Sequence, residues 1–196
     1  MKWLSREWHS GGLTDEAVRR IEADYAAHTE RIRQLLPPGL QILSEAGGWV
    51  SLHDGRFIHV QRKVGRPDLL LVDVAAWTSQ GRTKVGNTWE EPRIHVRLAY
   101  EGAELISPVA SELDGTIRNP KTEILAGEVD VDENGVFEHR MLLWPTESPE
   151  FVVRFQSVEV AVVRFIDGRA DILYPPASHR ICSGSRPGHF CGPGSN

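Results

Sequence analysis

The apolar positions near the start of the chain recur with the period of an α-helix. From Val18 to Leu35 they lie three or four residues apart, which places them on one helix face. Thr14 precedes them as an N-cap, and Pro37 ends the pattern because proline cannot continue a helix. We therefore predict an amphipathic helix of about 22 residues. Its apolar stripe consists of Val18, Ile21, Tyr25, His28, Ile32 and Leu35. The stripe is too short for a sustained coiled coil, which favours packing on the chain's own sheet.

From Trp49 onward the period changes to two, as in strands with one buried face. The pattern predicts strands over 49–53, 57–64, 69–75, 93–100, 104–109, 123–130, 136–144, 151–156, 158–165 and 170–174. Asn134-Gly135 is typical of a two-residue hairpin turn, in which both residues have positive φ. Asp54-Gly55 and Asp167-Gly168 are weaker signals of the same kind.

No second long helical pattern separates these strands, so we expect neighbouring strands to pair antiparallel. The predicted fold class is α+β, with the N-terminal amphipathic helix packed on a curved antiparallel β-sheet that is sandwich- or barrel-like. Residues 1–174 are expected to form a single domain. Residues 175–196 are rich in Gly, Pro and Ser and are expected to be a flexible tail.

Composition narrows the possible partners and the compartment. The chain has 196 residues and a net charge of -5, so it offers no general basic field for nucleic acid or an anionic membrane. No apolar run approaches the ~20 residues that span a bilayer. The opening residues lack the apolar core of a secretory signal, and both cysteines lie in the tail. We expect a cytoplasmic protein with no nucleic-acid partner and no membrane association.

Common catalytic and nucleotide-binding motifs are absent from the sequence, and no cofactor is expected. His53 and Asp54 are the first candidate site. A histidine beside an aspartate can serve as an oriented general base. The alternative is that Asp54 begins a hairpin turn with Gly55 and its carboxylate binds local backbone.

His139 is the second candidate, because on a strand it shares an apolar face with Phe137 and Met141. It is either a core histidine with satisfied hydrogen bonds or the lining of a cavity, where its pKa would be useful for function. On the preceding strand, Glu128 is expected to form a surface ion pair with Arg140.

Two further groups lie in loops. Trp77, Arg82 and Trp89 resemble a partner-binding surface, unless each tryptophan only covers an end of the sheet core. In the tail, the side-chain types suit zinc, but their spacing matches no common zinc finger, so no metal site is expected. These weak candidates are His179, Cys182, His189 and Cys191.

The segment Met1–Trp8 resembles the start M-[KR]-[YW]-[LF]-[ST]-[KR]-E-W of uncharacterised bacterial proteins. Residues 52–54 and 135–143 also resemble segments of such proteins, which have domains of unknown function. The resemblance implies a bacterial cytoplasmic protein and, by analogy alone, an immunity or accessory factor.

We expect a non-enzymatic protein-binding module, similar to an immunity factor, that engages another protein through an acidic, β-rich surface. The alternative is a small-ligand-binding protein or enzyme with a pocket in the β-sheet near His139. The two differ in what surrounds His139, because the alternative requires a cavity with convergent polar groups.

Overall fold

The computed structural model describes residues 3–78, 93–108, 121–145, 150–166 and 169–174, with the short pieces 83–85, 88–90, 113, 115–116 and 119. The helical elements are α1 (Arg6–His9), α2 (Asp15–Ile32), η1 (Leu40–Ile42) and η2 (Ser44–Ala46). The strands are β1 (Val50–Lys63), β2 (Arg66–Thr78), β3 (Thr83–Val85), β4 (Thr88–Glu90), β5 (Arg93–Glu101), β6 (Glu104–Ser107), β7 (Glu123–Val131), β8 (Phe137–Trp144), β9 (Phe151–Phe155), β10 (Ser157–Ile166) and β11 (Arg169–Tyr174).

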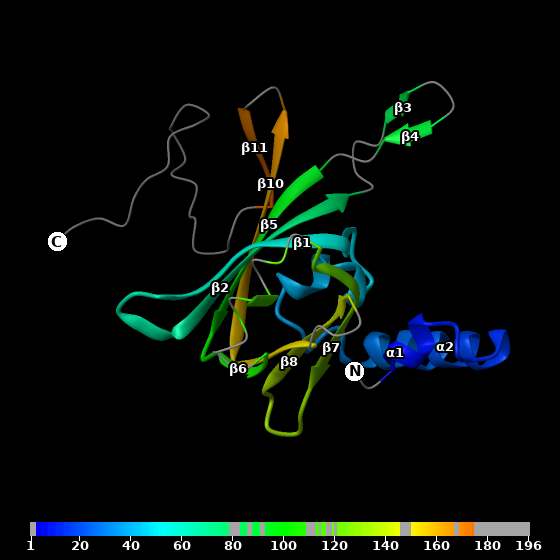
Figure 1. Cartoon of the computed structure of the whole chain (residues 1–196). Coiled ribbons are helices and arrows are strands. Elements are labelled where there is room, and N and C mark those ends of the chain that lie inside the picture. Colours follow the sequence, from blue (N-terminus) through cyan, green and yellow to red (C-terminus); the bar gives the residue numbers. More distant parts are fainter. Residues whose placement is uncertain are drawn as a thin grey trace.

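The strands form two larger antiparallel sheets and one small hairpin. The five-stranded sheet has the order β1-β2-β5-β10-β11, the four-stranded sheet has the order β6-β9-β8-β7, and β3 pairs with β4 (Figure 1). All strand pairs are antiparallel, which confirms the pairing predicted from the period-two pattern. The sandwich- or barrel-like shape stays a prediction.

A single cluster of buried residues draws side chains from both sheets. Phe57 of β1 lies 5.2 Å from Phe151 of β9, measured between ring centroids. Tyr100 of β5 lies 4.8 Å from Phe155 of β9. The residues of η1 and η2 add to the same core, and Leu40 is fully buried. The segment between α2 and β1 is therefore part of the core rather than a surface linker.

The helix α2 begins at the predicted N-cap, where Thr14 Oγ1 accepts from the Ala17 N–H at 3.3 Å. It ends at Ile32, earlier than predicted, and two leucines beyond its end differ in burial. Leu35 is 63% exposed, whereas Leu36 is 2% exposed and joins the core. Figure 1 shows α2 lying near β7 and projecting away from the sheets. In the described part of the chain no helix is long and apolar enough to cross a membrane.

The hairpin between β7 and β8 forms at the predicted Asn134-Gly135, but with a different turn. Gly135 has φ of 76°, while Asn134 is not in the left-handed region. Asp132 sets the turn instead, because its carboxylate accepts from the Asn134 and Val136 N–H groups, each at 2.9 Å. The sequence therefore located the turn correctly and its conformation wrongly.

The Asp54-Gly55 pair is not a hairpin turn. Both residues lie inside β1, in an irregularity between Ser51 and Arg56 where the register with β2 shifts. A Cβ on Gly55 would be 2.6 Å from the Leu52 carbonyl oxygen, so a close backbone approach requires this glycine. The turn from β1 to β2 occurs at Gly65, which has φ of 78°.

Substitution of the adjacent leucines after α2 tests where the core begins. We expect Leu36→Ala to lower the free energy of unfolding by about 2–4 kcal/mol, because it leaves a cavity in the core. Leu35→Ala is the matched control and should change it by less than about 0.5 kcal/mol. Urea denaturation followed by circular dichroism measures both. Equal losses would contradict the placement of the two side chains.

Candidate functional site

A pocket of about 190 Å³ opens where α2, η2, β1 and β7 meet. Its polar lining comes from Tyr25, Ser44, Glu45 and His53. The remaining walls are Leu4, Leu125, Ala126 and Gly127. Residues far apart in the sequence thus converge on one small, open pocket.

Two strand irregularities shape this pocket. In β1, the register shift before Arg56 includes His53 and Asp54, and Asp54 has φ of 58°, a left-handed conformation that few residues other than glycine adopt. In β7, the register with β8 shifts between Ile124 and Ala126, so that Leu125 is the extra residue. The two strands contact each other. Bulges of this kind often re-aim side chains next to functional sites.

Glu45 supplies a buried carboxylate at the pocket wall, with a side chain only 5% exposed. Its Oε2 accepts from the Ser44 hydroxyl at 3.1 Å. The side chain lies directly over Gly127, where an added Cβ would be 2.3 Å from Oε1. The absence of a side chain at Gly127 is therefore what admits the carboxylate.

Behind Glu45, two polar side chains continue into the core. The Tyr100 hydroxyl lies 2.7 Å from His139 Nδ1, and His139 Nε2 lies 3.9 Å from Glu45 Oε1. Burial, together with the charge of Glu45, raises the pKa of Tyr100 well above its ordinary value. Tyr100 therefore keeps its proton, and its hydroxyl shares one hydrogen bond with Nδ1 whose direction depends on the tautomer of His139. Nε2 has no hydrogen-bond partner among the described residues.

Tyr25 joins α2 to this site. Its hydroxyl donates to the Glu45 carbonyl at 3.0 Å and accepts from the Val129 N–H at 3.0 Å. Burial and then the charges of Glu45 and Glu128 raise the pKa of Tyr25, although the Val129 N–H opposes them. Both roles of the hydroxyl are used inside the protein, so Tyr25 forms a wall and fixes η2.

Glu128 holds the segment that forms another wall of the pocket. Its carboxylate accepts from the Trp3 N–H at 2.8 Å and also from the Leu4 N–H. It faces Arg140 in the strand register, as predicted, and Arg140 also binds Glu138. The predicted surface location is wrong, because Glu128 is buried and its carboxylate accepts from backbone N–H groups.

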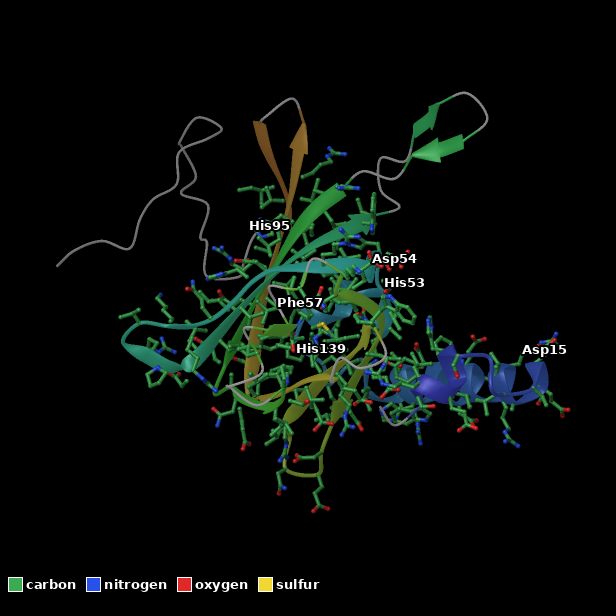
Figure 2. The ribbon with its side chains drawn as sticks, viewed as in Figure 1. Asp15, His53, Asp54, Phe57, His95 and His139 are labelled. Carbon is green, nitrogen blue, oxygen red and sulfur yellow. The ribbon has the colours of Figure 1, made fainter. Side chains whose placement is uncertain are left out.

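His53 lines the pocket and Asp54 lies beside it on β1, as Figure 2 shows for the pair, with His53 Nδ1 3.3 Å from Asp54 Oδ1. Both side chains are more than half exposed. Asp54 is thus close to the histidine, as the base hypothesis requires, and it does not begin a turn. His139 is fully buried and does not line the pocket; it reaches the pocket only through Glu45.

A second polar group lies on the outer face, which we define as the five-stranded-sheet side chains that point away from the core. On β5, residues Arg93, His95 and Arg97 alternate with the buried Ile94 and Val96. In the register of β2 and β5, the outer face includes Leu71, Asp73, Ala75, Trp77, Arg93, His95, Arg97 and Ala99.

Asp73 is the centre of this outer face. Arg97 binds it with two hydrogen bonds, Nε to Oδ1 at 2.7 Å and Nη2 to Oδ2 at 3.0 Å. His95 Nε2 lies 3.2 Å from Oδ1. Burial alone would raise the pKa of Asp73, but the hydrogen bonds and charge of Arg97, with His95, hold it below its usual range.

The predicted partner surface is only partly described. Trp77 lies on the outer face, and the Arg93 guanidinium carbon is 4.8 Å from the centre of its ring, a cation–π geometry. Trp89 lies in β4, whose side chains are outside the described atoms, and Arg82 lies outside the described residues. The weak metal candidates His179, Cys182, His189 and Cys191 lie outside the described residues as well.

The sequence missed Glu45, Ser44 and Tyr100 as site residues. Glu45 lies in a three-residue helix that has no period to mark its buried side, and Tyr100 follows the alternation of an ordinary core strand. Gly127 was the available signal, because a glycine inside a strand often marks a close approach by another group.

Comparison with known proteins adds no assignment. No family model matches the chain, and no curated protein or solved structure is significantly similar to it.

Substitution at Gly127 tests the packing of Glu45. We expect Gly127→Ala to lower the free energy of unfolding by about 1–3 kcal/mol, because the new methyl group overlaps the Glu45 side chain. Gly115→Ala, where nothing lies within 4 Å, should have a much smaller effect. In a Glu45→Ala background the Gly127→Ala cost should fall. Chemical denaturation of the four variants measures this coupling, and an unchanged cost in that background would contradict the contact.

Removal of Arg97 tests the Asp73 cluster by its pH dependence. At pH 7 we expect Arg97→Gln to cost about 1 kcal/mol, a value kept small because the Arg97 side chain is 53% exposed. The depressed pKa of Asp73 stabilises the fold above about pH 4 and loses that effect as pH falls through the folded-state value. The difference between variant and wild type should therefore shrink below about pH 4. Urea denaturation from pH 3 to 7 measures it, and a pH-independent difference would contradict the assignment.

Proposed function

We propose that the chain is a non-enzymatic protein-binding module and that its outer face contacts another protein. The observation that carries the proposal is the row of Arg93, His95 and Arg97 on one strand, with Trp77 beside Arg93. Tryptophan and arginine are the residues most enriched among those that dominate binding energy at protein interfaces. We also propose, more narrowly, that the chain is an immunity-type factor that acts in the cytoplasm.

The exposure of the outer face supports this role. Arg93 and Arg97 are exposed, and partly exposed small residues lie beside them, Ala75 opposite His95 and Ala99 two residues beyond Arg97. Small side chains project little from the sheet, so a partner can approach the neighbouring arginines closely. Asp73 fixes Arg97 in one orientation, which lowers the side-chain entropy that Arg97 would lose on binding.

The charge of this face favours an acidic partner. Arg97 and His95 lie beside Asp73, and Arg93 lies farther along β5 opposite Trp77, so this part of the face has two arginines for one carboxylate even though the whole chain carries -5. This departs from the acidic contact surface expected from the net charge, because a total charge does not say where cations gather. Carboxylates of a partner would pair with Arg93 and would steer the encounter.

The proposal is tested by charge reversal on this face. We expect the wild-type chain to capture one stoichiometric partner from an extract of its native organism, and Arg93→Glu to reduce that capture about tenfold or more, through repulsion of acidic groups. Raising the salt concentration should weaken capture of the same partner. Quantitative mass spectrometry of the captured proteins gives the measurement.

Arg19→Glu on α2 is the matched control, because it makes the same change of charge at an exposed residue away from the outer face. It should leave capture unchanged. Capture that is equal for wild type and Arg93→Glu, or the absence of any stoichiometric partner, would contradict the proposal.

A further inference from the structure

We propose that the pocket beside Glu45 binds the cationic end of a small organic molecule, an alkylammonium or a guanidinium group. The Glu45 carboxylate would pair with the cation, and the apolar walls would receive the carbon atoms next to it. This site is separate from the outer face, so the ligand-binding proposal can be tested independently of the proposed function.

The Glu45 carboxylate is buried and has few hydrogen-bond partners among the described residues. Its side chain is 5% exposed, and its only hydrogen bond from a described residue comes from the Ser44 hydroxyl. A charged group that is removed from water is costly unless an opposite charge and further hydrogen bonds compensate for it. An ammonium or guanidinium group in the adjoining pocket supplies both.

Among the described residues, His139 is the cationic candidate found within 4 Å of the Glu45 carboxylate, and its geometry is poor for this purpose. Its Nε2 is 3.9 Å from Oε1, beyond hydrogen-bond distance. Its Nδ1 is 2.7 Å from the hydroxyl of Tyr100. At 3.9 Å the imidazole makes no hydrogen bond to the Glu45 carboxylate, so a closer charged donor in the pocket would bind that carboxylate more strongly.

The size and lining of the pocket select the kind of cation. At about 190 Å³ it is smaller than the ~300–1,000 Å³ typical of sites for drug-sized ligands, so it suits a single head group with a short stem. Leu4, Leu125 and Ala126 give that stem apolar contacts. In the described residues no three His, Cys, Asp or Glu side chains gather as metal ligands, which favours an organic cation over a metal ion.

The rim favours a cation as well. His53 lines the opening, and the Asp54 carboxylate next to it adds negative charge within 3.3 Å of its ring. Figure 2 shows these two residues together on β1, apart from the buried His139. A carboxylate beside the lining residue His53 raises the local concentration of cations near the pocket.

Titration of the whole chain tests the proposal, with two-dimensional NMR as the readout. The probes are n-butylammonium chloride and methylguanidinium chloride; sodium chloride at equal ionic strength and n-butanol, the neutral analogue, are the controls. We expect saturable shifts of the Gly127, Ala126 and Ser44 amide signals with at least one cation and with neither control. No saturable shift in the wild type, or an equal response to n-butanol, would overturn the proposal.

Variants locate the binding. Glu45→Gln keeps the shape and removes the charge, and should weaken binding about tenfold or more. Glu133→Gln, an exposed acid in the turn between β7 and β8, is the matched control and should bind as wild type does. Ala126→Leu fills the pocket and should abolish binding even if Glu45→Gln fails to fold. Unchanged affinity in a folded Glu45→Gln or Ala126→Leu variant would overturn the proposal.

A last arm separates two sources of the same cation. Nα-acetyl-lysine methylamide carries an alkylammonium group on a peptide backbone. If it binds as tightly as n-butylammonium, the pocket accepts a lysine side chain of a polypeptide. If it binds tenfold more weakly, the pocket is specific for free small molecules, and both results support a cation site.

Discussion

The arrangement of this protein depends on one buried contact, the passage of the Glu45 side chain over Gly127. A carboxylate that lies against strand backbone requires a residue without Cβ, and the short helix η2 must be held at a fixed depth to place it. Tyr25 fixes the position of η2, because its hydroxyl forms hydrogen bonds with both the Glu45 carbonyl and the Val129 N–H. One tyrosine thus joins α2, η2 and β7, and the pocket lies at their junction.

The two candidate surfaces differ in how their charges are compensated. On the outer face, Asp73 has a bidentate arginine and a nearby histidine, so its charge is stabilised within the protein. In the pocket, Glu45 has one hydroxyl and a distant imidazole. The outer face therefore offers arginines to an incoming molecule, whereas the pocket wall offers a carboxylate with one hydrogen bond from the described residues.

The helix and most strands were predictable because each has a fixed spacing of buried side chains that shows in the sequence. Alternation over β5 and β8 located the strands and placed His139 on a buried face, and the Asn134-Gly135 pair located a hairpin. The site was less predictable because it is made from departures from regularity. Asp54-Gly55 suits a turn or a bulge equally well, and only pairing with β2 decides between them.

Three-residue helices pose a related difficulty, since they are too short for a burial pattern. Nothing in the local sequence distinguishes Glu45 from an ordinary surface acid, although the core has Leu43 and Ala46 on either side of it. Similarly, Leu36 rather than the predicted Leu35 is buried in the core, because α2 ends before either residue. The spacing of apolar residues in a helix does not indicate where that helix ends. Such positions are set by tertiary contacts.

The clamp between Glu128 and the backbone of Trp3 has a consequence for the order of folding. These residues are 125 positions apart, and the chain between them includes β1, β2 and β5. Contacts of this separation form late, because a long loop must close before they can contribute. Since Leu4 is a wall of the pocket, the binding site is completed only after β7 has been synthesised and docked. During translation the five-stranded sheet can begin to pair while the pocket does not yet exist.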